Sequence, residues 1–407
     1  MKPVCFLNNH LCLRGGSERV MFEEAAMLRG RGHEVSFFGC RGPSDLEQEH
    51  AALYPPRVAI EQLRGFGKWR HALRVVYNPA MGRAFRRFLD VARPGILHAH
   101  NIYGGLTTAV LDVAREAGLP VVLTVHDYKL VCPSYLALDH GRVCSACAGG
   151  RFYRCLLKRC HKSSLAASAL YTAEAYLVAW GKKYAPIRRF ICVSRFARQT
   201  LLDNGYAPDR LAYLPNSVET AGVVASPGEG AHALYAGRLS IEKGARTLLR
   251  AMKGLDIPLR VVGDGPLRGE LEAESARLGL RGRVTFAGYQ SGEALAREFR
   301  EAAFLVIPSE WYENAPMSVL EAFAHGKPVI GADIGGIPEM VEPGQTGLLF
   351  PAGDADALRE RMDTLGRDRA RREEMGRAAR RRAEEEFSPE RHAEELLEVY
   401  EDCLRRG

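Results

Sequence analysis

Residues 304–332 read FLVIPSEWYENAPMSVLEAFAHGKPVIGA. The apolar run Phe304–Ile307 predicts a buried strand, and Pro328–Ala332 predicts a second strand. Between them, Pro316 suits the first turn of a helix, because proline lacks the N–H that this turn leaves unpaired. A strand, a helix and another strand in this order form a βαβ unit with parallel strands. The segment therefore predicts an α/β fold.

The same alternation recurs along the chain. The other predicted strands are Val4–Leu7, Glu34–Phe38, Ile96–His98, Val121–Val125, Arg189–Val193, Ala233–Ala236, Leu259–Val262 and Val284–Phe286, with helices such as Ser17–Arg31, Gly105–Ala117, Arg246–Met252 and Gly292–Glu301. The pattern runs twice, and a stretch rich in Pro, Gly and Ser, from Pro215 to Gly228, separates the two runs. Because helices cover both faces of a parallel sheet, we predict two doubly wound domains whose strand ends face a cleft.

The predicted domains are residues 1–205 and 206–387, followed by a last helix at 388–407. Ser388 and Pro389 suit the cap and the first position of that helix. The Arg- and Glu-rich run at 367–386 predicts a solvated helix face rather than a binding site.

Charge is unevenly distributed. Residues 1–190 contain 27 Lys and Arg against 14 Asp and Glu, whereas the remainder contains 29 against 35. A basic first half suits an anionic partner, either a membrane surface or nucleic acid, although a solvated basic surface has the same composition. The first apolar run is too short for a signal peptide, and no uncharged stretch approaches the roughly 20 residues that span a bilayer. We therefore expect a cytosolic location.

Two predicted loops suit an anionic ligand. Gly15 and Gly16 precede a helix, whose free N–H groups attract anions, and Ser17 is expected to cap that helix. Arg238 and Lys243 lie on a loop that opens another helix, so that two cations could face a diphosphate. Each loop also has an ordinary explanation, since Gly-Gly turns and solvated cations are common without a ligand. Val262-Gly263-Asp264-Gly265-Pro266 adds a tight turn of low specificity.

Histidines follow two strands of the first half. His98 and His100 lie at the end of one strand, and His126 follows another. A histidine in such a place is more often a hydrogen-bonded structural group than a catalyst. His126 is the stronger candidate because Asp127 follows it, but neighbouring strand residues point to opposite faces, so we do not predict an Asp–His dyad.

Glu313 and Glu321 are eight positions apart, one in a loop and one inside the next helix. Carboxylates accept hydrogen bonds well from vicinal hydroxyl groups. Two of them at two heights along one ligand suit a molecule with two polyol parts, such as a sugar and a ribose. The alternative is a helix with ordinary surface glutamates, and the other four loops favour the ligand.

At these residues the chain resembles the retaining glycosyltransferases of family 4, which have the GT-B fold of two Rossmann-like domains. The matching motifs are Glu313…Glu321, Gly15-Gly16-Ser17-Glu18-Arg19-Val20, His98-Ala99-His100, Gly237-Arg238…Lys243-Gly244, Gly335-Gly336-Ile337-Pro338-Glu339 and Gly344…Thr346-Gly347-Leu348-Leu349. The likeness covers essentially the whole chain. It implies that the last helix crosses back onto the first domain.

The resemblance also implies the site residues. Arg238 and Lys243 would hold the diphosphate of a UDP- or GDP-sugar, with the backbone of Gly15 and Gly16 nearby. Glu321 would bind the ribose. The transferred sugar would meet Glu313, His126 and the backbone of Asn314, Ala315, Pro316 and Met317, and Leu348 would lie near the nucleotide.

The implied reaction moves a sugar to a glycan or lipid-linked acceptor in surface polysaccharide or glycolipid synthesis. Fixed cations and a helix N-terminus can stabilise the leaving diphosphate without a catalytic cofactor, and the chain has no Asp-x-Asp metal motif. The alternatives are a GT-B-like protein that binds a nucleotide or glycan without catalysis, and an epimerase or phosphorylase. The site motifs do not require nucleic acid.

Four cysteines crowd together at Cys144, Cys147, Cys155 and Cys160. In a cytosolic chain this spacing predicts a structural zinc site with four thiolate ligands. Disulfides and free thiols are the alternatives, and the seven-residue spacer is short for a zinc ribbon.

Two basic and aromatic segments, Arg64–Arg74 and Lys158–Lys183, suggest a peripheral contact with the inner face of a membrane. A helix that covers the sheet explains the second segment equally well.

Overall fold

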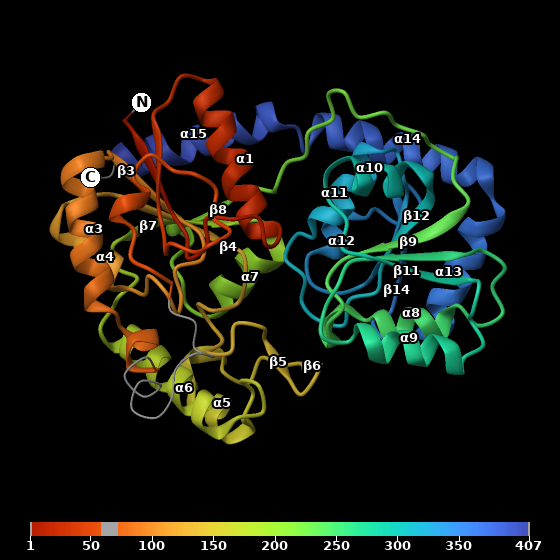
Figure 1. Ribbon diagram of the computed structural model, residues 1–407, viewed down its shortest axis with the longest axis horizontal. Helices are drawn as coiled ribbons and strands as arrows, with labels where there is room; N and C mark the ends of the chain where they lie inside the picture. Colours follow the sequence, from red (N-terminus) through yellow and green to blue (C-terminus); the bar gives the residue numbers. More distant parts are fainter. Residues whose placement is uncertain (1, 58–71, 406–407) are drawn as a thin grey trace. The chain divides into compact units, whose positions relative to one another are not determined.

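The computed structural model describes residues 2–57 and 72–405, which fall into two compact units (Figure 1). The first unit comprises Met1–His140, Cys144–Leu214 and His392–Gly407, and the second comprises Gly141–Val143 and Pro215–Arg391. The first unit thus runs to Leu214, where the sequence suggested 205. Most of Arg64–Arg74 lies outside the described residues.

The first unit contains a six-stranded parallel sheet in the order β2-β1-β3-β4-β7-β8. Its strands are β1 (Val4–Leu7), β2 (Val35–Phe38), β3 (Ile96–Ala99), β4 (Val121–Val125), β7 (Ile187–Cys192) and β8 (Leu211–Tyr213). Its helices are α1 (Gly16–Gly30), α3 (Pro79–Ala92), α4 (Ala109–Glu116), α5 (Tyr153–Lys158), α6 (Leu165–Trp180), α7 (Arg195–Asp203) and α15 (Pro389–Arg405). A short pair, β5 (Leu138–Asp139) and β6 (Arg142–Val143), forms a separate two-stranded sheet.

The second unit also contains six parallel strands, in the order β11-β10-β9-β12-β13-β14. They are β9 (His232–Ala236), β10 (Leu259–Val262), β11 (Val284–Gly288), β12 (Ala302–Ile307), β13 (Val329–Ala332) and β14 (Gly347–Phe350). The helices are α8 (Ala245–Ala251), α9 (Arg268–Arg277), α10 (Gly292–Glu301), α11 (Met317–Ala324), α12 (Ile337–Met340), α13 (Ala355–Arg367) and α14 (Arg369–Glu385).

The central strands are buried on both faces. Every residue of β1, β3, β4 and β12 is buried, as expected of parallel strands covered by helices. The apolar residues of these strands stabilise the sheet through the hydrophobic effect, and the two buried polar residues among them, His98 in β3 and Thr124 in β4, bond each other at 2.7 Å.

The last helix packs in the first unit, as the resemblance implied. The Tyr400 hydroxyl lies 2.6 Å from His98 Nδ1, and Arg188 Nη1 donates to the carbonyl of Cys403 at 2.8 Å. Asp402 pairs with Arg189. The helix begins at Pro389, and Ser388 Oγ accepts from the N–H of Arg391 at 3.4 Å, so the predicted start is confirmed.

Two local expectations differ from the structure. Gly15, not Ser17, is the N-cap of α1, because the Ser17 hydroxyl lies inside the helix and bonds Glu18 Oε2 and Asn101 Nδ2 instead. Helix α11 begins at Met317, with Pro316 as its N-cap. Within the described residues, no helix has both the length and the apolarity to cross a membrane.

Candidate functional site

Ligands of doubly wound sheets bind where the strand order reverses, at the carboxyl ends of the two central strands. In the second unit, numbered along the chain, the strands lie in the order 3-2-1-4-5-6, so the reversal lies between β9 and β12. In the first unit it lies between β1 and β3. The loops after these four strands contain most of the residues that the sequence singled out.

Lys243 and Glu313 come from the two loops at the reversal in the second unit and form an ion pair. Lys243 Nζ lies 2.6 Å from Glu313 Oε1, and Ser309 Oγ donates to the same oxygen at 2.6 Å. The Lys243 ammonium also lies 5.1 Å from the centre of the Trp311 ring. The two residues are 70 positions apart, and only the parallel pairing of β9 and β12 brings them together.

The backbone of both loops is shaped by glycines. Gly244 has φ +68°, and a Cβ there would lie 1.7 Å from the carbonyl oxygen of Pro308, so only glycine lets the two loops approach. Gly335 has φ +62°, and its Cβ would lie 2.5 Å from the carbonyl oxygen of Glu313. The N–H of Gly336 donates to that same oxygen at 2.7 Å. The Gly335-Gly336 motif therefore holds the backbone of Glu313 in place.

Glu313 is a buried carboxylate that stays ionised. Burial would raise its pKa, but the charge of Lys243 and the hydrogen bonds from Lys243 and Ser309 outweigh burial, so the pKa lies below 4.5. Arg238 is exposed, and its guanidinium has no partner within the part of the chain that the structure describes. Its loop is fixed through its backbone, whose carbonyl accepts from the Tyr235 hydroxyl at 2.8 Å. The loop therefore presents one paired and one unpaired cation.

Unpaired polar atoms gather beside the N-terminus of α11. Asn314 is buried, yet neither its amide nitrogen nor its amide oxygen has a hydrogen-bond partner among the described residues. The same holds for Oδ1 of Asn216, whose Nδ2 donates to the carbonyl of Ala315 at 3.3 Å. Buried polar groups are nearly always satisfied in folded proteins, so these atoms fit a polar ligand. The sequence pointed to the backbone of this loop but not to these side chains.

Glu321 and Leu348 occupy different surroundings. Glu321 is half-buried in α11, and its backbone carbonyl bonds the ring of His325 at 2.8 Å. Leu348 lies in β14 beside Ile330 and is buried in the core of the second unit. The predicted contacts of both with a nucleotide remain predictions.

In the first unit, asparagines join the loops after β1 and β3. Asn8 Oδ1 accepts from the N–H of Asn101 at 2.8 Å, and Asn9 Oδ1 accepts from the N–H of Leu106 at 2.8 Å. Gly15 is extended at φ −162°, and a Cβ there would meet Glu18 Oε2 at an ordinary 3.6 Å. The fold therefore does not require glycine at position 15. A ligand that approaches the backbone closely would explain why a glycine is present there.

His126 bonds a histidine rather than its neighbouring aspartate. His126 Nε2 lies 2.8 Å from His100 Nδ1, whereas Asp127 Oδ1 accepts from the N–H of Lys129 at 2.8 Å. Desolvation of the ring and the neighbouring His100 lower the pKa of His126 to about 3, so the ring is neutral. Desolvation raises the pKa of Asp127 to about 6.

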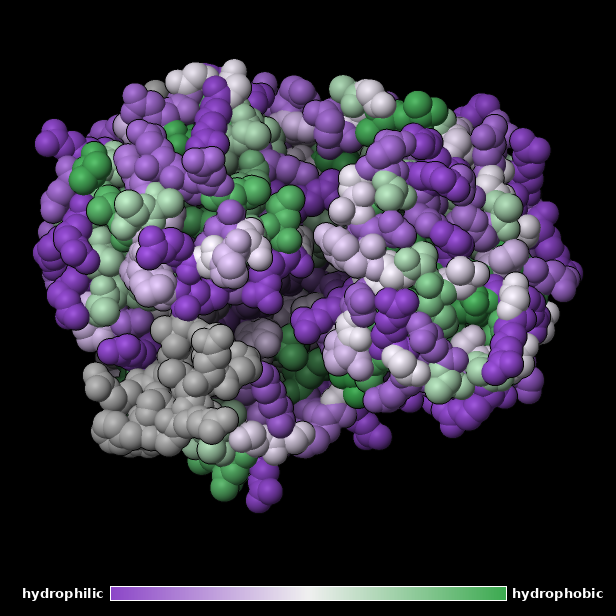
Figure 2. Space-filling model, viewed as in Figure 1, coloured by the Kyte–Doolittle hydropathy of each residue, from purple (hydrophilic) through white to green (hydrophobic). Residues whose placement is uncertain are grey.

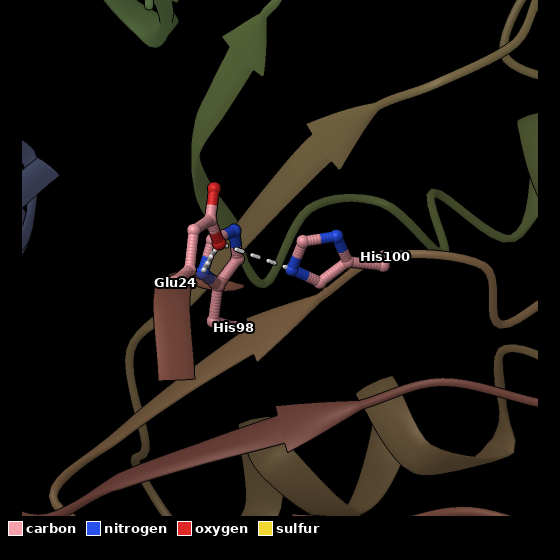
Figure 3. A group of neighbouring side chains, drawn as sticks. All are labelled: Glu24, His98 and His100. Carbon is pink, nitrogen blue, oxygen red and sulfur yellow. Dashed lines mark ion pairs between the residues drawn. The ribbon is translucent and has the colours of Figure 1, made fainter. Parts of the chain in front are cut away.

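A cluster of Glu24, His98 and His100 lies behind His126. Figure 3 shows the Glu24 carboxylate reaching from α1 toward both rings, with Oε2 3.5 Å from His98 Nδ1 and 3.4 Å from His100 Nε2. The three ligand atoms lie within 4.8 Å of one another, as a metal site requires. Both nitrogens of His98 are engaged, however, by Tyr400 at 2.6 Å and by Thr124 at 2.7 Å. The cluster is therefore better described as a hydrogen-bond network.

The predicted zinc ligands are not gathered into one set. Of the described residues, the only three or more metal-ligating groups within 4.8 Å of one another are those of the Glu24 cluster, so no three of the four sulfur atoms meet that distance. Cys144 Sγ accepts from the N–H of Ala146 at 3.5 Å. Hydrogen bonding to Cys160 lowers the pKa of the Cys155 thiol. The cysteines bond locally, and all four are free of disulfides.

Two family models match the chain. The model described as Glycosyltransferase Family 4 matches residues 14–221, slightly more than half of the chain. The chain belongs to glycosyltransferase family 4. The model described as Glycosyl transferases group 1 matches residues 219–382, which contain Lys243 and Glu313. The two matches thus follow the two units.

Curated relatives of this family 4 member match it over part of their length. The α-D-kanosaminyltransferase of Streptomyces kanamyceticus is 31% identical over 137 residues, which cover 32% of this chain and 35% of the relative. The D-rhamnosyltransferase of Pseudomonas aeruginosa is 37% identical over 131 residues, which cover 32% of this chain and 34% of the relative. The match therefore spans about a third of each of these relatives.

Solved structures show the same fold over the whole chain. Sucrose-phosphate synthase from Thermosynechococcus elongatus has a TM-score of 0.75 at 20% identity and covers 100% of both chains. The HepE protein of Anabaena, in complex with UDP and glucose, has a TM-score of 0.69 at 17% identity and covers 99% of this chain and 100% of its own. Together with the two parallel sheets, these likenesses confirm the predicted GT-B fold.

Proposed function

We propose that this family 4 member is a retaining glycosyltransferase that moves a sugar from a UDP- or GDP-sugar to a glycan or a lipid-linked acceptor. The observation that carries the proposal is the ion pair between Lys243 and Glu313, which joins a phosphate-binding cation to a hydroxyl-binding carboxylate at the reversal of a 3-2-1-4-5-6 sheet. The UDP complex of HepE, a protein of the same fold, supports a nucleotide donor.

The proposed donor lies along the loops after β9 and β12. The Lys243 ammonium and the Arg238 guanidinium face the diphosphate, and the N–H groups at the start of α11 add partial positive charge. The Glu313 carboxylate accepts hydrogen bonds from hydroxyl groups of the transferred sugar, and the amide of Asn314 supplies a donor and an acceptor beside it. In this proposal Glu321 binds the ribose and His126 binds the transferred sugar.

The chemistry is breakage of the bond between the anomeric carbon and the leaving phosphate oxygen. The electron pair moves to the diphosphate, whose growing charge Arg238 and Lys243 stabilise without a metal ion. The acceptor hydroxyl attacks the anomeric carbon on the same face that the diphosphate leaves, which retains the configuration. Its proton passes to the leaving phosphate oxygen.

The proposal includes a peripheral membrane contact. The enzyme would be cytosolic and would meet its acceptor at the inner face of the membrane. Helix α6 buries three polar residues, Ser168, Thr172 and Glu174, together with Val178, while Leu177 and Trp180 are 54% and 75% exposed. The buried glutamate pairs with Lys129 at 2.5 Å. Figure 2 shows apolar and polar side chains together at the lower edge, where Figure 1 draws α5 and α6.

The flanks of this surface are basic. Arg151, Arg154, Lys158 and Arg159 lie in and around α5, and Lys182 and Lys183 follow α6; of these, Lys158 pairs with Asp139 and Lys183 with Asp112. An exposed apolar helix face between clustered cations suits an anionic lipid surface. The double variant Leu177→Ala/Trp180→Ala should reduce co-sedimentation with anionic vesicles. The control Tyr289→Ala, which removes a 70% exposed ring from the second unit, should not. If co-sedimentation of the wild-type protein did not depend on the anionic lipid content of the vesicles, the membrane contact would be dropped from the proposal.

Structural zinc on the four cysteines stays a prediction of their spacing. Metal analysis of the purified protein should find one zinc ion per chain, lost when the four cysteines are changed to serine. A chain without zinc would leave the transferase proposal untouched, because no cysteine takes part in it.

A panel of UDP- and GDP-sugars tests the main proposal through thermal stabilisation and sugar transfer. A donor present at 100 times its Kd should stabilise the fold by about 2.7 kcal/mol. Glu313→Gln should lose transfer, whereas Glu298→Gln, at a buried glutamate of α10 that pairs with Arg260 of β10, should keep it. If no sugar nucleotide stabilised the protein, the enzyme proposal would be wrong. If a sugar nucleotide stabilised the protein but no sugar was transferred to glycan acceptors, the alternative of a GT-B-like binding protein without catalysis would be favoured.

A further inference from the structure

A buried ion pair joins helix α6 to the loop that follows β4. Lys129 Nζ lies 2.5 Å from Glu174 Oε2, and the two side chains are 4% and 6% exposed. The ammonium also donates to the carbonyl of Pro133 at 3.1 Å and lies 4.6 Å from the centre of the Tyr171 ring. Lys129 comes three residues after His126, which the proposed function places at the transferred sugar. The pair therefore fastens the loop of a candidate site residue to a neighbouring helix.

This loop closes on itself between Tyr128 and Tyr135. The N–H of Tyr128 donates to the carbonyl of Tyr135 at 3.0 Å, and the N–H of Cys132 donates to the carbonyl of Tyr128 at 2.7 Å. The N–H of Tyr135 donates to the carbonyl of Cys132 at 2.9 Å. Pro133, which accepts a hydrogen bond from the Lys129 ammonium, lies within this closed loop. One cation thus connects two parts of the closed loop with each other and with α6.

The end of the closed loop has a strained backbone. Tyr135 has φ +59° and Ala137 has φ +50°, in the left-handed region that residues other than glycine rarely adopt. Such backbone persists only where the surrounding contacts hold it, and it gathers at functional sites. The strain therefore indicates that contacts from outside hold this segment in a shape that it would not adopt alone.

The buried polar residues of α6 have separate partners. Ser168 Oγ accepts from the N–H of His161 at 3.1 Å. Thr172 Oγ1 donates to the carbonyl of Phe152 at 3.4 Å. Both of these bonds join α6 to the segment that precedes it in the chain. Glu174 instead reaches back to the closed loop, so its contact is the one that bears on the loop after β4.

Burial of two charges is not needed for stability at such a place. The attraction between the charges offsets their lost hydration only in good geometry, and apolar side chains of similar volume often stabilise a protein as well or better. A buried pair does, however, favour one arrangement strongly, because a displaced loop would leave a buried charge without its partner. The pair between Lys129 and Glu174 therefore suits a role in fixing the geometry of the loop.

We propose that Glu174 and Lys129 are positioning residues that hold the closed loop, and with it His126, in the shape that sugar transfer requires. The inference rests on the proposed function for the role of His126. Neither side chain touches the donor or the acceptor, and both act through the backbone of the loop. The N–H of Lys129 donates to Asp127 Oδ1 at 2.8 Å, which links the fixed residue to the neighbour of His126.

An apolar replacement of both residues separates positioning from stability. Lys129→Met/Glu174→Met leaves no buried charge, so its free energy of unfolding should stay near the wild-type value. The single variant Glu174→Met, which leaves a buried cation, should be less stable. Sugar transfer by the double variant should nevertheless fall by about 10-fold or more, since a displacement of about 1 Å can cost about 100-fold in rate. The loss should lie in kcat and not in the affinity for UDP or GDP.

Ser168→Ala is the matched control, because it removes another buried polar group of the same helix without touching the closed loop. This variant should keep the wild-type rate of transfer even if it is less stable. A double variant that transfers sugar at the wild-type rate would overturn the inference. An equal loss of transfer in Ser168→Ala would also overturn it, because the effect would then belong to the packing of α6 in general.

Amide hydrogen exchange tests the same inference without a substrate. The N–H groups of Tyr128, Cys132 and Tyr135 should exchange faster in the double variant than in the wild-type protein, while those of the central strands keep their protection. Unchanged exchange in the closed loop would show that the pair does not hold it and would overturn the inference. If the wild-type protein transferred no sugar from any donor, the proposed function would fail, and the exchange measurement would still decide whether the pair holds the loop.

Discussion

Lys243→Met removes the cation from the buried ion pair while keeping the length and apolar packing of the side chain. Glu313 Oε1 would then be left with Ser309 Oγ at 2.6 Å. Loss of one partner from a buried pair costs about 3–5 kcal/mol. The Lys243 side chain is 24% exposed and that of Glu313 is 6% exposed, so water replaces part of the loss. We expect destabilisation of about 2–3 kcal/mol at neutral pH, below the fully buried range.

The loss should depend on pH with a definite sign. In the wild-type protein the folded pKa of Glu313 is depressed, so its stabilising effect is present above its unfolded pKa and is lost as the pH falls through the folded value. Without Lys243, burial dominates and the folded pKa rises above 4.5. The variant then gains stability as the pH falls, because a protonated carboxyl needs no cation. The difference between the proteins should therefore be largest near neutral pH and shrink toward acid pH.

Urea unfolding of both proteins, followed by fluorescence at several pH values, measures this difference. Lys243→Arg is the matched control, since it keeps the charge and should keep the pH dependence of the wild-type protein. A deficit that is the same at every pH, or one that Lys243→Arg shares in full, would refute the assignment of the effect to the charge of Lys243.

Further predictions concern the loops and the last helix. Gly244→Ala should destabilise the protein by more than Gly254→Ala in thermal unfolding. Both place a side chain at positive φ, for about 1–2 kcal/mol, but only the first adds a Cβ 1.7 Å from a carbonyl oxygen of the loop after β12. Gly15→Ala should leave the melting temperature unchanged, because its Cβ meets nothing closer than 3.6 Å, and should raise the KM for the donor; unchanged donor kinetics would remove this glycine from the site. Tyr400→Phe should destabilise the fold by about 1–3 kcal/mol, because it leaves His98 Nδ1 without its 2.6 Å partner, and amide hydrogen exchange should show the loss in α15; exchange unchanged in α15 would contradict this.

Much of the fold follows from periodicity. Val4–Leu7, Val121–Val125 and Leu259–Val262 are strands with the predicted bounds, because their apolar runs are bordered by turns. Strand β8 has only three residues, too few for a periodic pattern, and β14 follows a Gly-x-Thr-Gly turn that the sequence marked as a motif rather than a strand. Burial in the finished sheet, not the local pattern, makes these segments strands.

The site was less accessible to sequence reasoning. Strand ends locate Lys243 and Glu313 on separate loops, but their ion pair depends on the pairing of β9 with β12, which no local pattern encodes. Glu24 could not be assigned from the helix that contains it. The alternation of His98 and His100 was the available signal, since residues two apart on a strand share a face. The cysteine spacing suggests a zinc site, and although no three of the four sulfur atoms lie within 4.8 Å of one another, that site stays a prediction.

Isothermal titration of UDP and GDP into the wild-type protein and the Lys243→Met variant tests the central claim most directly, because it needs no acceptor. The account predicts that one of the two nucleotides binds the wild-type protein, and that the variant binds it about 10-fold or more weakly, as expected when a charge-assisted contact of about 1.5–3 kcal/mol is lost. Failure of both nucleotides to bind, or equal binding by both proteins, would contradict it.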